Sequence, residues 1–157
     1  MEYLFVKWLH VISSTVLFGT GVGSAFYLLA TTLSRDVRAV AVVTRMVVRA
    51  DWLFTATTAV LQPLTGFWLM HLAGLPLQTP WIRISIVCYV LAILCWLPVV
   101  WLQIRLRDIA SEAANSGQAL PPRYWRFFKW WVALGVPAFF LFVALFWLMV
   151  AKPAWPA

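Results

Sequence analysis

The chain opens with Tyr3-Leu4-Phe5-Val6-Lys7-Trp8-Leu9-His10, the start of a long apolar run that decides how the rest is organised. Lys7 and His10 lie three residues apart, so on a helix they share one face. An ionisable pair in hydrocarbon surroundings is costly unless it has partners or a function. The opening therefore predicts a membrane-spanning helix whose ionisable pair is either functional or held by specific partners.

Composition places the whole chain in a membrane. Hydrophobic residues make up 64% of its 157 residues and charged residues 11%, which a soluble domain of this size could not bury. The formal net charge of +7 is concentrated in two short segments between apolar runs, the pattern of the positive-inside rule. We therefore expect the lipid bilayer as a partner and exclude nucleic acid, which needs a basic surface interleaved with aromatic side chains.

The apolar runs predict a single all-α domain, residues 1–157, built as a four-transmembrane-helix bundle. The expected spans are about 3–33, 51–72, 81–106 and 127–150. An amphipathic segment at about 34–50 and a loop at about 107–126 should lie in the cytoplasm, because nine of the twelve Lys and Arg residues lie in or beside them. The topology is therefore N-out and C-out, in a bacterial inner membrane.

Polar side chains recur at three- and four-residue spacing along the second span: Asp51, Thr55, Thr58, Gln62 and Thr65. Facing lipid, this stripe would leave several hydrogen-bonding groups unpaired, so we expect it to face the bundle interior. Asp51 is expected to pair with Arg49 or to cap the span. The alternative is a role as a proton-relay carboxylate. Cys88 and Cys95 are expected to be reduced thiols.

The topology places Lys7, His10, His71, Arg83 and Met149 in the periplasmic half. His10 and His71 could ligate a haem b axially, with Lys7 and Arg83 pairing its propionates. Copper is the alternative, held by His10, His71 and Met149, because imidazole and thioether both suit it. A simpler interpretation stands beside each: His10 bonded to a neighbouring hydroxyl or carbonyl, His71 solvated at the interface, and Met149 as packing.

Electron transfer, with a quinone or a redox protein as partner, is the function expected of a haem site. The small residues Gly19, Gly21 and Gly23 would let another helix or a flat cofactor approach the backbone of the first span. A cofactor-free accessory subunit, in a homo-oligomer or a larger membrane complex, is the remaining alternative. No hydrolase or nucleotide-binding motif is present, and whether the protein is an enzyme stays open.

Several segments resemble a family of predicted integral membrane proteins of unknown function. They are Lys7-Trp8-Leu9-His10, Phe18-Gly19-Thr20-Gly21, Arg49-Ala50-Asp51-Trp52, Gln62-Pro63-Leu64-Thr65-Gly66, Cys95-Trp96-Leu97-Pro98 and Phe146-Trp147-Leu148-Met149. These segments cover all four expected spans, and the resemblance therefore implies a multi-pass membrane protein.

The opening segment is also similar to the copper-resistance D-like group, which includes the HemJ-type protoporphyrinogen oxidase. That resemblance implies haem b at His10 and Lys7. The group's Trp-x-His-x-Lys stretch reads Trp81-Ile82-Arg83-Ile84-Ser85 here. Both expected residues are missing from it, so the resemblance extends to haem binding and not to porphyrinogen oxidation.

Overall fold

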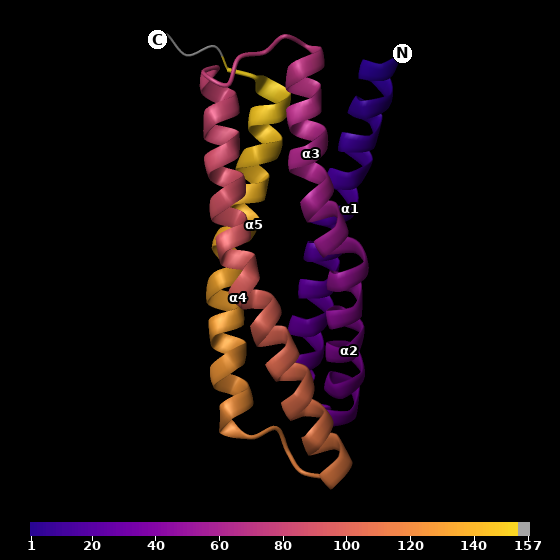
Figure 1. The fold of residues 1–157 in the computed structure, drawn as a ribbon. Coiled ribbons are helices and arrows are strands. Elements are labelled where there is room, and N and C mark those ends of the chain that lie inside the picture. The colour runs from indigo at the N-terminus through magenta and orange to yellow at the C-terminus, as the bar shows by residue number, and fades with distance from the viewer. Residues whose placement is uncertain (154–157) are drawn as a thin grey trace.

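A computed structural model, which describes residues 1–153, consists of long helices running side by side (Figure 1). The elements in chain order are α1 (Glu2–Ser34), α2 (Val37–Ala50), the π-helical segment η1 (Asp51–Thr55), α3 (Ala56–Leu72), α4 (Pro80–Ser116) and α5 (Pro122–Ala151). No strand occurs within residues 1–153. The expected all-α class is confirmed.

The helices run alternately up and down, and α2, η1 and α3 follow one another without a break (Figure 1). The N-terminus and the last turns of α5 lie at one end of the molecule, here called the terminal end. The α1–α2 turn and the loop between α4 and α5 lie at the opposite end, here called the basic end.

Within residues 1–153, three helices are long and apolar enough to cross a membrane: α1, α4 and α5. The predicted second span corresponds to η1 and α3, and α3 by itself has 17 residues. The structure therefore supports a multi-pass protein with three candidate spans and a fourth helical run beside them.

The predicted loop at about 107–126 is wrong over most of its length. Helix α4 continues to Ser116 and α5 begins at Pro122, so only residues 117–121 connect them. The helix continues because its small residues Ala110 and Ala113 are buried in a stretch where α4 packs against α2. The left-handed Gly117, with φ of 66°, then ends it.

The predicted amphipathic segment is α2, and its two faces are as expected. Asp36 caps its N-terminus by accepting hydrogen bonds from the backbone N–H groups of Arg38 and Ala39. Val40 and Val47 are buried, and the arginines of the segment are exposed. The buried face packs on α1 and α4, so α2 is part of the helix bundle.

The main apolar core lies in the half of the bundle next to the basic end. It joins α1, α2, α4 and α5 through Leu28, Val40, Ala41, Val47, Val99, Leu102, Leu106, Ala110, Tyr124, Phe128 and Trp131. At its centre the hydroxyls of Thr32 and Tyr124 form a fully buried hydrogen bond of 2.8 Å. This half of the bundle fixes how the α4–α5 pair sits against α1 and α2.

In the other half, α1 packs on α3 and α4 packs on α5. All five residues of the predicted polar stripe are buried, as expected. The Gln62 amide locks α3 to α1 by donating to the His10 carbonyl at 2.9 Å and to the Ser13 hydroxyl. The two helix pairs meet there through Phe18, whose ring stacks on Phe139 with centroids 5.7 Å apart.

Candidate functional site

His10 is held in one orientation by α3. Its Nδ1 atom lies 2.7 Å from the Thr65 hydroxyl oxygen, and that hydroxyl donates its own hydrogen to the Leu61 carbonyl at 2.8 Å. When the hydroxyl donates to that carbonyl, Nδ1 is the donor and the lone pair is on Nε2. Within residues 1–153, Nε2 has no hydrogen-bond partner. This is the arrangement of an imidazole oriented by a second residue for use at Nε2.

The other residues predicted for this site lie at the surface of the bundle. His71, Lys7, Arg83 and Met149 are all exposed. The Lys7 ammonium lies 5.9 Å from the centroid of the Tyr3 ring instead. Across the described chain no three His, Cys, Asp or Glu side chains cluster as metal ligands would. The haem and copper assignments stay predictions.

A second site lies deeper in the bundle, where the two helix pairs part beside the apolar core. A cavity of about 450 Å³ separates α1 and η1 from α4 and α5. Small residues keep it open: Gly21, Ser24 and Ala25 line it from α1, and Gly135 and Ala138 from α5. Most of the remaining lining is aromatic or aliphatic. A largely apolar cavity of this size is typical of small-molecule sites.

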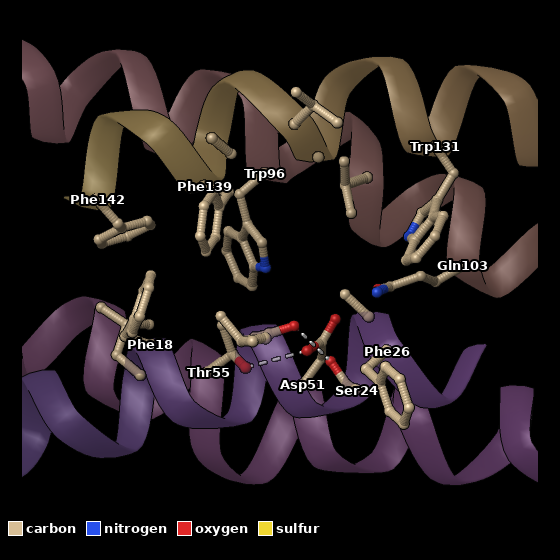
Figure 2. A pocket seen from close by; sticks show the side chains of 18 of the residues that line it. Phe18, Ser24, Phe26, Asp51, Thr55, Trp96, Gln103, Trp131, Phe139 and Phe142 are labelled. Carbon is tan, nitrogen blue, oxygen red and sulfur yellow. Dashed lines mark hydrogen bonds between the residues drawn. The ribbon is translucent and has the colours of Figure 1, made fainter. Parts of the chain in front are cut away.

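Four polar side-chain atoms that line this cavity are buried without a hydrogen-bond partner. They are Asp51 Oδ2, Trp96 Nε1, Gln103 Oε1 and Trp131 Nε1. No other side chain in residues 1–153 has a buried nitrogen or oxygen in this condition. Figure 2 shows Trp96, Gln103 and Trp131 on one side of the space and Asp51 facing them from the other. All buried polar side-chain atoms of the described residues that lack a hydrogen-bond partner therefore belong to residues lining this cavity.

Asp51 reaches the cavity from the π-helical segment η1. Its carboxylate accepts a hydrogen bond from the Thr55 hydroxyl at 3.0 Å through Oδ1, and Oδ2 has no hydrogen bond within 3.5 Å. The Gln103 side chain faces this carboxylate across the cavity (Figure 2). The side chain is 3% exposed and forms no ion pair with Arg49, so the expected pairing is wrong. π-Helical turns are frequent at functional sites because the wider turn shifts the direction of the side chains it carries.

Sequence reasoning missed Trp96, Gln103 and Trp131 as site residues. Trp131 is buried in the core, although it lies near the expected start of the fourth span, where tryptophans usually face the membrane interface. Gln103 is an amide five residues past Pro98 in the apolar run of α4, and it is 5% exposed. An amide in such a run is the one signal that could have been followed, because polar groups inside a membrane span require partners.

The fold and the cavity together define an all-helical, multi-pass integral membrane protein with a ligand-sized space between its helix pairs. Residues 4–153 match the family described as "Predicted integral membrane protein (DUF2269)". The chain belongs to this family. No match is found among curated proteins or among solved structures.

Proposed function

We propose that this protein binds a flat, lipid-soluble molecule of the quinone and quinol class in the cavity between its helix pairs. One observation carries the proposal: all four buried, unpaired side-chain polar atoms of the described chain line this cavity. Leaving such an atom unpaired costs about 1–3 kcal/mol. A ligand that pairs several of them recovers that free energy on binding.

The chemistry of the four atoms selects the head group. The indole N–H groups of Trp96 and Trp131 can only donate, whereas the carbonyl oxygen of Gln103 and a carboxylate oxygen of Asp51 accept. The ligand must therefore offer acceptors and donors together. A ring hydroxyl does both, so a quinol can receive hydrogen bonds from the indoles and donate to the oxygens. A quinone carbonyl satisfies the indoles alone.

The shape of the cavity suits a ligand that enters from the bilayer. Phe26 and Phe140 line it and are themselves 63% and 62% exposed, so the cavity reaches the lipid-facing surface between α1 and α5. A planar ring would lie between the small residues of these helices and the aromatic side chains around them. An attached prenyl tail would then extend into lipid.

Replacing each indole by a benzene ring tests the proposal. In Trp96→Phe and Trp131→Phe, we expect the affinity for a short-chain benzoquinol to fall about tenfold each, because each variant removes one hydrogen-bond donor. The measurement is isothermal titration of the protein in nanodiscs. Trp147→Phe is the matched control, because Trp147 is 68% exposed and does not line the cavity. Equal losses in all three variants, or no binding by the wild type, would overturn the proposal.

Haem b at His10 is a second candidate function, and the orientation of that imidazole favours it. Hydrogen bonding to Thr65 leaves Nε2 free to ligate iron. His10 would supply one axial ligand to the iron. The exposed His71 would have to turn inward to supply the second. Copper at His10, His71 and Met149 and a cofactor-free accessory role stay as alternatives, and an oligomer or a redox-protein partner is compatible with each.

For this candidate, His10→Ala is expected to abolish the visible absorption of a bound b-type haem, because it removes the one oriented imidazole. The measurement is a reduced-minus-oxidised spectrum of protein expressed with ample haem. Thr65→Val should shift or broaden the bands without abolishing them, since it removes only the group that orients the ring. An unchanged spectrum in His10→Ala would exclude His10 as a ligand, and a colourless wild type would exclude haem.

We also infer that η1 and α3 form a fourth membrane span and that both termini face the periplasm of a bacterial inner membrane. The inward-facing polar stripe supports the span, because it leaves an apolar surface of α3 toward lipid, with Val60, Leu64 and Phe67 exposed. The concentration of arginines at the basic end supports the orientation.

A further inference from the structure

A second pocket lies at the basic end, where the end of α1 meets the start of α5. It has a volume of about 480 Å³ and is lined by Arg35, Ala119, Leu120, Trp125 and Lys129. These residues come from the α1–α2 turn, the α4–α5 loop and the first turns of α5. Two cations separated by 94 positions in the chain therefore share one pocket.

Neither cation is neutralised by the protein. The only ion pair within residues 1–153 joins Arg107 to Asp108. The nearest carboxylate in sequence to Arg35, that of Asp36, is engaged in capping α2. The pocket thus holds two positive charges with no carboxylate within 4 Å of either.

Arg35 ends α1 in a left-handed backbone conformation, as Lys152 ends α5. Arg35 has φ of 60° and ψ of 11°, the left-handed conformation at the end of α1 that normally selects glycine. Its guanidinium lies 5.9 Å from the centroid of the Trp125 ring, which holds it at the pocket. A non-glycine residue in this conformation costs free energy.

We propose that this pocket binds the phosphate group of an anionic phospholipid. The two unpaired cations attract the single negative charge of a phosphodiester, and a guanidinium donates to phosphate oxygens in pairs. Leu33 and Trp130, which adjoin Arg35 and Lys129 closely in sequence, are 62% and 61% exposed. They supply apolar surface for acyl chains beside the pocket. Basic pockets between membrane helices are known to take such head groups. This site is independent of the quinol cavity.

The test compares two double variants with the same change in net charge. Arg35→Gly/Lys129→Gln empties the pocket of charge, and Arg45→Gln/Arg126→Gln removes two exposed cations that do not line it. Native mass spectrometry of protein titrated with phosphatidylglycerol and, separately, phosphatidylcholine gives the affinities. We expect the wild type to bind phosphatidylglycerol more tightly than phosphatidylcholine. The affinity of the pocket variant for phosphatidylglycerol should be about tenfold lower, and that of the control should be unchanged.

The pocket variant should fold, because glycine relieves the left-handed backbone at position 35. Its thermal unfolding midpoint, measured alongside, should therefore match or exceed that of the control. Equal losses of phosphatidylglycerol in both double variants would show a general charge effect and overturn the site. Displacement of the lipid by millimolar inorganic phosphate, or phosphate binding without a lipid preference, would overturn the assignment to a phospholipid.

Discussion

Gly135→Leu is expected to abolish quinol binding while leaving the protein at least as stable as the wild type. A Cβ atom added at Gly135 meets nothing within 4 Å, because the residue borders the cavity. A leucine side chain would extend into the space that the ring of the ligand is proposed to occupy. Replacing glycine inside a helix also favours folding by up to about 1 kcal/mol. We expect a loss of affinity of about 100-fold or more, since the ligand and the side chain exclude one another.

Gly19→Leu is the matched control for this prediction. Gly19 lies on α1 two positions before Gly21, has nothing within 4 Å of an added Cβ, and does not line the cavity. The same gain in helix propensity applies to it, so the two variants differ in the cavity alone. Titration with the quinol and thermal unfolding are measured on both. Undiminished binding in Gly135→Leu would place the ligand elsewhere.

Tyr124→Ala is expected to cause the largest loss of stability, about 3 kcal/mol. Tyr124 is 0% exposed and joins the core to α1 through its hydrogen bond to Thr32. Its ring also stacks near-parallel to that of Phe128, with centroids 6.4 Å apart. In a membrane protein the loss is one of packing and hydrogen bonding, because helices apart from one another still lie in apolar surroundings.

Two further variants separate the parts of this effect. Tyr124→Phe keeps the ring and should cost about 1 kcal/mol, the contribution of a buried hydrogen bond. Tyr27→Ala removes a tyrosine that is 63% exposed and should change stability little. Denaturant titration in mixed micelles, followed by tryptophan fluorescence, gives the free energies. A Tyr124→Ala variant as stable as Tyr27→Ala would contradict the role of this core.

The cavity and the apolar core are adjacent, and polar atoms that would serve a ligand in the cavity are unfavourable for folding. Trp131 belongs to the core and lines the cavity with its indole N–H unpaired. Asp51 likewise places a carboxylate oxygen in an apolar space without a partner. Apolar side chains at these positions would remove an unfavourable contribution to folding. Polar groups kept where they destabilise the empty protein are typical of a ligand site.

The polar stripe shows how far the sequence reaches. Its five members lie on one face because the helical period fixes their angular positions, and burial follows from the cost of exposing hydrogen-bonding groups to lipid. The buried positions of Asp51 and Gln62 were therefore predictable. The partner of Asp51 was not predicted, because its carboxylate bonds Thr55 within the buried stripe while Arg49 is exposed.

The histidines show the converse. His10 and His71 were predicted at similar depth, but depth says nothing about direction across the bundle. His10 faces α3 and bonds Thr65, whereas His71 is exposed in the last turn of α3. The haem and copper assignments needed both side chains at one point, and only the packing of α1 on α3 decides which side chains meet.

The sequence by itself determined the membrane class, the long helices and the basic end, because composition, helical period and charge distribution act along the chain. Only the tertiary structure decided the cavity and the basic pocket. Asp51 and Trp131 are 80 positions apart, as Arg35 and Lys129 are 94, and nothing local relates them. These residues come together through the packing of the helices. Helix α2 packs on α4, and the cavity lies where α1 and η1 separate from α4 and α5.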